Sequence, residues 1–217
     1  MEDTVGRGAT PRRLLFSAVA VAIVVVVAFA AVLLNVGANG RGGVVARPTP
    51  TLQGGADMQG HPAPAFTLRD QDGAVVSLQA LHGRPVVLTF LDGTCTEQCP
   101  LMVQYLNWTT QFMTRKQVDD VAWVAITVNP NNTRSQASAF LAKNKAAVPI
   151  RFLLGSQAEL QPLWKAYYIA VEPGQTDVVH TSGLYVIDQQ GRERVWMDAG
   201  FDPKALAGDL QELLGTT

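Results

Sequence analysis

Two cysteines in one short segment are the residues of this chain best suited to chemistry. Cys95 and Cys99 are the only cysteines among 217 residues, and Pro100 follows them directly. Thiols at this spacing can close a disulfide or converge on one soft metal ion, because thiolates are good ligands for soft metals. The segment Gly93–Pro100 therefore predicts either a redox pair or part of a metal site.

The residues around this segment predict a strand before it and a helix after it. Val86–Leu91 is a nearly continuous aliphatic run, typical of a strand buried on both faces. Apolar residues then recur at helical spacing over 101–113. Proline is favoured at the first position of a helix, so Pro100 predicts Cys99 as the N-cap. The positive end of the helix dipole would stabilise a thiolate there, which favours nucleophilic or metal-binding roles.

The rest of the chain alternates strands and helices in the order of a thioredoxin-like α/β domain. We expect a first hairpin from 66–68 and 75–78 around a turn at 70–73. Further strands are expected at 121–128, 181–188 and 192–198, and helices at 133–144 and 157–168. A final helix, capped by Asp202, should reach Leu214.

His180 is the third candidate ligand. It stands just before the predicted strand at 183–188, at the end of a strand that can come near the loop leaving Val86–Leu91. With two cysteines at the same edge of the sheet, we interpret His180 as a ligand rather than a solvated loop residue. His61, in a predicted linker, and His82, at the opposite end of Val86–Leu91, are interpreted as surface residues.

The N-terminal part of the chain carries a membrane signal. Leu14–Leu34 contains no charge, and a helix of that length spans roughly 31 Å, close to the hydrocarbon core of a bilayer. It is longer than the apolar part of a usual signal peptide, so we predict a retained transmembrane anchor, with cleavage near Ala28–Ala31 as the alternative. Arg7, Arg12 and Arg13 predict that residues 1–13 are cytoplasmic and that the chain crosses the cell membrane once, with the following domain outside.

The composition indicates one domain on a tether. Residues 35–62 are rich in Gly and Pro and predict a flexible linker, which leaves 63–217 as the folded domain. The formal net charge is −1, and no basic run is interleaved with aromatic residues. Nucleic acid is therefore not an expected partner.

Three groups of residues resemble the Sco/SenC copper proteins, from about residue 60 to the C-terminus. They are Phe66–Leu68 with Asp70–Gly73, the Cys-x-x-x-Cys-Pro core at 95–100, and His180–Ser182 before Leu184–Asp188. The resemblance implies a membrane-anchored copper metallochaperone with a thioredoxin-like fold on the outer side of the membrane, which assists assembly of the copper centre of cytochrome c oxidase.

The resemblance also implies a ligand set and partners. Cys95, Cys99 and His180 would bind one copper ion. The partners would be the copper-bearing subunit of cytochrome c oxidase, a thioredoxin-like reductant, and membrane lipid through the anchor. Two thiolates suit Cu(I), and an added imidazole lets the site also accept Cu(II). A structural zinc site normally needs four protein ligands, and the sequence offers no third cysteine.

Two positions depart from the family pattern. Asn129 stands where relatives usually carry an acidic residue before the proline, and Val179 stands where an aspartate commonly precedes the histidine. A missing carboxylate beside His180 could change the orientation and basicity of the imidazole.

An extracytoplasmic thiol-disulfide oxidoreductase is the alternative function. One of the two cysteines would attack and the other resolve, in a compartment where disulfides persist. Thioredoxin-type reductases, however, use Cys-x-x-Cys and carry a cis-proline where this chain has His180–Ser182. A peroxiredoxin-like peroxidase is a weaker third possibility, because the sequence shows no recognisable Thr and Arg environment for a peroxidatic cysteine.

Overall fold

A six-stranded sheet forms the centre of the computed structural model, which describes residues 52, 54–173 and 178–215. Its strand order is β1-β10-β9-β4-β5-β6. The strands are β1 (Ala56–Asp57), β4 (Val86–Leu91), β5 (Ala122–Thr127), β6 (Arg151–Leu153), β9 (Gly183–Ile187) and β10 (Glu193–Asp198). Strands β4, β5 and β6 are parallel, whereas β9 runs antiparallel to both β4 and β10.

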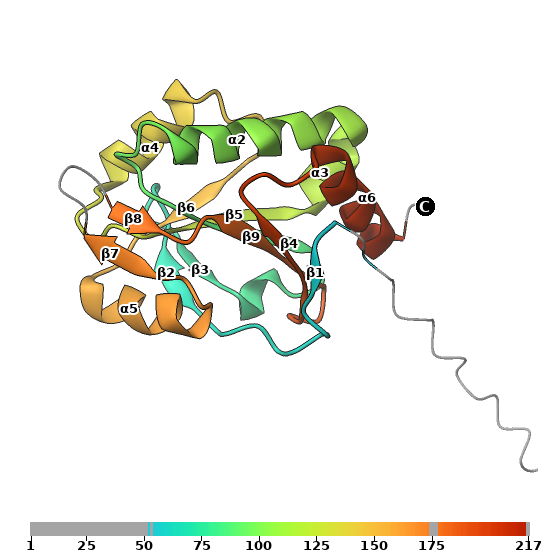
Figure 1. Cartoon of the computed structure of the whole chain (residues 1–217), viewed down its shortest axis with the longest axis horizontal. Helices are drawn as coiled ribbons and strands as arrows, with labels where there is room; N and C mark the ends of the chain where they lie inside the picture. The colour runs from blue at the N-terminus through green and yellow to red at the C-terminus, as the bar shows by residue number, and fades with distance from the viewer. Residues whose placement is uncertain (1–51, 53, 174–177, 216–217) are drawn as a thin grey trace, which may run out of the picture. The chain divides into compact units, whose positions relative to one another are not determined.

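Two hydrophobic layers cover the sheet (Figure 1). The first contains residues of α2 (Gln98–Thr109), α3 (Arg115–Asp120), α4 (Arg134–Lys143) and α6 (Pro203–Leu214). The second contains α5 (Gln157–Ala166) and the hairpin of β2 (Thr67–Arg69) and β3 (Val75–Ser77). Two 3-10 turns, η1 (Gln79–Leu81) and η2 (Thr110–Phe112), and a hairpin of β7 (Val171–Pro173) and β8 (Val178–His180) complete the described elements.

Strand β4 separates the two layers because its side chains alternate between the faces of the sheet. Val87 and Leu91 pack in the first layer, while Val86, Leu88 and Phe90 pack in the second. All six residues of β4 are buried, as the uninterrupted apolar run predicts. The strand that leads to the cysteines is therefore fixed from both sides.

The expected mixed α/β fold and several of its elements are confirmed. Leu68 of β2 pairs with Val76 of β3, so the predicted first hairpin forms. The carboxylate of Asp202 caps α6 by accepting a 2.9 Å bond from the amide of Lys204. That helix ends at Leu214, and Gly215 then takes the left-handed conformation, with φ of 70°, that favours glycine.

The start of α2 differs from the expectation. The N-cap is Glu97 and the helix begins at Gln98, so Cys99 lies inside the first turn. The amide of Leu101 donates to the carbonyl of Glu97, which closes that turn. Pro100 is tolerated there because the first amides of a helix have no partner within the helix. Cys99 is therefore held by helical geometry rather than by a flexible cap.

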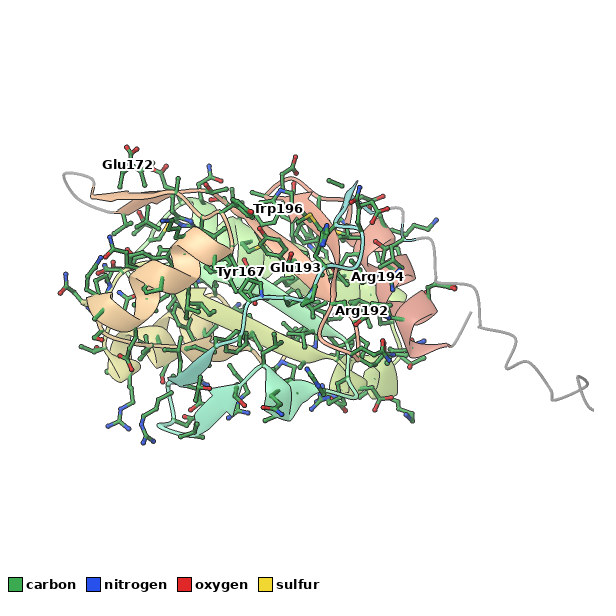
Figure 2. All side chains as sticks on the ribbon, turned by 90° about the horizontal axis from the view of Figure 1, so that it is seen from below. Tyr167, Glu172, Arg192, Glu193, Arg194 and Trp196 are labelled. Carbon is green, nitrogen blue, oxygen red and sulfur yellow. The ribbon has the colours of Figure 1, made fainter. Side chains whose placement is uncertain are left out.

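The packed domain also begins before the expected Ala63. Strand β1 pairs with β10, and Pro62 forms a bridge with Arg192. The hydroxyl of Tyr167 donates a 2.6 Å bond to the carbonyl of Pro64. Figure 2 shows Tyr167 beside Glu193, whose backbone pairs with Gly60 and His61. These residues are held by backbone hydrogen bonds, which do not depend on residue type. No apolar periodicity in the sequence therefore marks them as part of the domain.

The predicted cytoplasmic N-terminus at 1–13, the anchor at 14–34 and the linker as far as residue 51 lie outside the described residues. Among the helices that are described, none combines the length and apolar character needed to cross a bilayer.

Candidate metal centre

The end of β4 and the start of α2 position the two cysteines. After Leu91 the chain turns, and the amide of Cys95 donates to the carbonyl of Asp92 at 3.2 Å. The loop then returns, so that the amide of Cys99 donates to the sulfur of Cys95 at 3.4 Å. Both thiols are free; Cys95 is half-buried and Cys99 is 2% exposed. The more accessible sulfur therefore belongs to Cys95.

His180 lies beside the sulfur of Cys99. The imidazole Nε2 is 3.8 Å from the Cys99 sulfur, although 81 positions separate the two residues. His180 is the last residue of β8, a strand that the sequence did not predict, and it pairs there with Val171. The hairpin of β7 and β8 thus carries the imidazole to the start of α2.

A backbone carbonyl fixes the orientation of this imidazole. Nδ1 of His180 lies 2.8 Å from the carbonyl oxygen of Thr181. Because a carbonyl can only accept, Nδ1 is the donor in this contact, and in a neutral imidazole Nε2 would then present its lone pair toward Cys99. A carboxylate at position 179 is not needed for this tautomer, since Thr181 supplies the acceptor.

The two thiols have opposite proton affinities. A hydrogen bond from the Cys99 side chain, joined by the amides of Cys99, Glu97 and Gln98, lowers the pKa of Cys95 to about 5. The same interaction with Cys95 and the burial of its own sulfur raise the pKa of Cys99 well above its usual value. At neutral pH, Cys95 is the thiolate and Cys99 the proton donor. Amides at the start of a helix stabilise thiolates in this way.

Cys99 is the residue that connects the candidate ligands. It contacts Cys95 on one side and His180 on the other. A small cavity beside it is lined by Phe90, Met102, His180 and Ser182. Within the described residues, no three Cys, His, Asp or Glu side chains are already assembled as a metal-binding group. His61 and His82 are both exposed, as expected.

A buried carboxylate that sequence reasoning missed supports the cysteine loop. Asp92 is fully buried, and its Oδ1 accepts bonds from the amide and hydroxyl of Thr94 at 2.8 and 2.7 Å and from Asn132 at 2.9 Å. Its Oδ2 accepts from the amide group of Asn129 at 3.1 Å. Burial opposes ionisation, but these bonds outweigh it and lower the pKa of Asp92.

Asp92 also touches the buried thiol. Its amide donates to the sulfur of Cys99 at 3.4 Å. Asp92 directly follows β4, whereas Asn129 and Asn132 follow the neighbouring parallel strand β5. Polar residues after two adjacent parallel strands meet at one sheet edge, which is the signal that could have revealed this cluster.

Comparison with known proteins identifies one family over most of the described domain. The family model described as SCO1/SenC matches residues 55–215. A SCO1 protein homologue of Bacillus subtilis is 27% identical over 136 residues, which cover 58% of this chain and 68% of that protein.

Solved structures show the same fold. The copper-bound ScoI of Bradyrhizobium japonicum is 24% identical with a TM-score of 0.61, and the match covers 70% of this chain and 99% of that one. BsSco, described as a member of the Sco family of cytochrome c oxidase assembly proteins with a disulfide switch, is 23% identical with a TM-score of 0.62. The latter match covers 74% of this chain and 98% of BsSco.

Proposed function

The chain belongs to the SCO1/SenC family, and on that basis we propose that it is a membrane-anchored copper metallochaperone. It binds one copper ion through Cys95, Cys99 and His180 and assists assembly of the copper centre of cytochrome c oxidase. Its partner is the copper-bearing subunit of that enzyme, and the domain works on the extracytoplasmic side of the cell membrane, held by the anchor at 14–34. The copper bound to ScoI and the membership of BsSco in a family of cytochrome c oxidase assembly proteins support this proposal.

The observation that carries the proposal is the 3.8 Å approach of His180 Nε2 to the Cys99 sulfur. The Thr181 carbonyl holds the imidazole in the tautomer whose unprotonated nitrogen faces this sulfur. A nitrogen and a sulfur donor that already face the same space need little reorganisation to share one ion. Histidine is the ligand that adds affinity for Cu(II) to a site that thiolates make suitable for Cu(I).

The thiol pair supplies the remaining donors. The thiolate of Cys95 is present at neutral pH because its pKa is about 5. The proton on Cys99 must leave when copper binds, so uptake releases a proton and should strengthen as the pH rises. The half-buried position of Cys95 leaves one donor accessible to a recipient protein, as a carrier that hands on its ion requires.

Copper binding by the full chain, reduced and in detergent, tests this proposal. The wild type should take up one copper per chain. Cys95→Ser should abolish uptake, and His180→Ala should weaken Cu(II) binding sharply and change its thiolate charge-transfer absorption. His82→Ala is the matched control, because it removes an exposed histidine at the other end of β4. Equal losses in both histidine variants, or no copper uptake by the wild type, would contradict the proposed ligand set.

A thiol-disulfide oxidoreductase remains the second candidate, and the low pKa of Cys95 favours it. The Cys95 thiolate would attack a partner disulfide and release one partner thiolate. Cys99, losing its proton, would then attack the Cys95 sulfur and release the second, so that the pair is oxidised and the partner reduced. A thioredoxin-like reductant would restore the thiols. Rapid disulfide reduction by a protein that ignores copper would favour this function.

A further inference from the structure

The outer face of α2 and η2 carries large apolar side chains and no charge. Residues 98–114 contain no Asp, Glu, Lys, Arg or His. Leu101, Trp108 and Phe112 are 45%, 40% and 46% exposed. With the half-buried Tyr105 they follow the spacing of residues on one side of a helix. These four residues, called the α2 ridge, form an apolar surface that the described domain leaves uncovered.

The α2 ridge is held in place before any partner arrives. The ring of Tyr105 lies 5.2 Å from that of Trp108 and 5.4 Å from that of the buried Phe201. At the far end, the side-chain amide of Gln211 on α6 donates a 2.8 Å bond to the carbonyl of Phe112. A surface whose rings are already ordered loses little conformational entropy when it binds.

The end of α4 and the loop that follows it lie beside the α2 ridge and carry two lysines. Asn107 of α2 donates to the carbonyl of Lys145 at 3.0 Å and accepts from the amide of Ala147 at 2.7 Å. Lys143 and Lys145 are exposed, and neither forms an ion pair with another described residue. Exposed aromatic residues next to lysines match the apolar boundary and the anionic headgroups of a lipid bilayer.

The chain enters the domain on the same layer as the α2 ridge. Leu52 packs against the first hydrophobic layer, and the amide of Gly54 donates a 2.9 Å bond to the carboxylate of Asp209 on α6. Seventeen residues, 35–51, separate the predicted anchor, Leu14–Leu34, from Leu52. If they form the linker that the sequence predicts, their end-to-end distance would be roughly 21–25 Å. A tether of this length would give the domain an effective concentration of the millimolar order at the membrane surface, so that even a weak contact would form.

We propose that the α2 ridge docks on the anionic lipid surface in which the chain itself is anchored. This inference rests on the membrane anchoring in the proposed function. Because Cys99 lies in the first turn of α2, one end of the docked ridge is the candidate metal centre. Docking therefore holds the copper ligands at headgroup level, within reach of a membrane-embedded recipient.

Bromolipid quenching in nanodiscs tests the proposal with the full chain, one copy per disc, in lipid that contains phosphatidylglycerol. Trp108 is the accessible reporter, because Trp123 and Trp164 are 2% and 5% exposed and Trp196 is only partly exposed. Brominated lipid should quench the emission component that Trp108→Phe lacks. The double variant Leu101→Glu/Phe112→Glu should lose this quenching and still bind one copper.

Val75→Glu is the matched control, since Val75 is 57% exposed and lies on β3, which packs on the second layer. It should leave the quenching of Trp108 unchanged. If the chain enters the discs but brominated lipid does not quench Trp108, the docking proposal is wrong and the proposed anchor stands. A chain that does not enter the discs overturns both. A blue-shifted but unquenched Trp108 indicates a protein cover and also overturns docking, whereas loss of copper binding alone affects only the metal assignment.

Discussion

Replacement of Asp92 by asparagine should loosen the loop that carries both cysteines. The Asp92 carboxylate is fully buried and accepts bonds from Thr94, Asn129 and Asn132. An asparagine can keep its carbonyl oxygen at the Oδ1 position, where three of these bonds are made. Its NH₂ group then faces the NH₂ of Asn129, two donors without an acceptor. Asn129 cannot simply rotate its amide, because its own oxygen accepts a 3.0 Å bond from the amide of Asn131.

The magnitude follows from these bonds. Hydrogen bonds to a charged group are worth about 1 kcal/mol more than neutral ones. The variant loses the hydrogen bond from Asn129, and its three remaining bonds go to a neutral oxygen instead of a charged one. Part of this loss is offset, because burying a neutral amide costs less free energy than burying a carboxylate. The lowered pKa of Asp92 indicates that the bonds outweigh burial in the wild type. We expect a net loss of about 2 kcal/mol in unfolding free energy at pH 7, or roughly 4–8 °C in melting temperature.

The pH dependence has a definite sign. Because folding lowers the pKa of this carboxyl, its contribution is complete above the unfolded value near 3.9 and disappears as the pH falls through the lower folded value. The difference between wild type and Asp92→Asn should therefore shrink in acid.

Thermal unfolding followed by circular dichroism measures both effects. Asp72→Asn, a change at an exposed aspartate, is the matched control. Asn129→Asp alone should destabilise at pH 7, because two carboxylates would meet where Asn129 now donates at 3.1 Å. Combined with Asp92→Asn it exchanges acceptor and donor and should recover most of the loss. If Asp92→Asn and Asp72→Asn have the same melting temperature at pH 7, the Asp92 carboxylate does not hold the loop as described.

Three further outcomes are expected. Alkylation of reduced protein should modify Cys95 at a rate that is half-maximal near pH 5 while Cys99 stays unmodified, as read by mass spectrometry; equal labelling of both sulfurs would contradict the assigned proton positions. Gly183→Ala should destabilise the domain in urea by at least about 2 kcal/mol, because a Cβ there would lie 2.4 Å from the Trp196 ring. Glu193→Gln should stabilise at pH 8 but not at pH 4, because burial raises the pKa of Glu193 and its charge opposes folding only at the higher pH; a pH-independent change would argue against a buried charge.

Local features of the sequence predicted much of the fold. The run at Val86–Leu91 coincides with β4, and Asp202 caps the last helix, because composition and capping act over a few residues. The three-residue strands β6, β7 and β8 were not expected, whereas the equally short β2 and β3 were predicted with the help of the turn between them. The formation of β6, β7 and β8 depends on pairing with distant partners, such as that of Val171 with His180.

The candidate site likewise has parts that the sequence predicted and parts that it could not predict. The types and spacing of Cys95 and Cys99 identified them, and the sheet order made His180 a reasonable partner. The tautomer of His180 depends on the Thr181 carbonyl, a backbone group that every sequence contains, so residue types cannot indicate it. The cluster around Asp92 was predictable in principle from its place after β4, beside Asn129 after β5.

The two edges of the central sheet determine how copies of the domain can meet one another. Strand β1 forms one edge with only two residues, and β6 forms the other with three. Beyond β6, Leu154 bridges to Arg69 of the first hairpin, which occupies part of that edge. Long unpaired edges recruit strands from neighbouring molecules, and short or covered ones do not. Under the membrane anchoring proposed above, copies confined to one bilayer would collide more often than free ones, and these short or covered edges would keep them from joining into a continuous sheet.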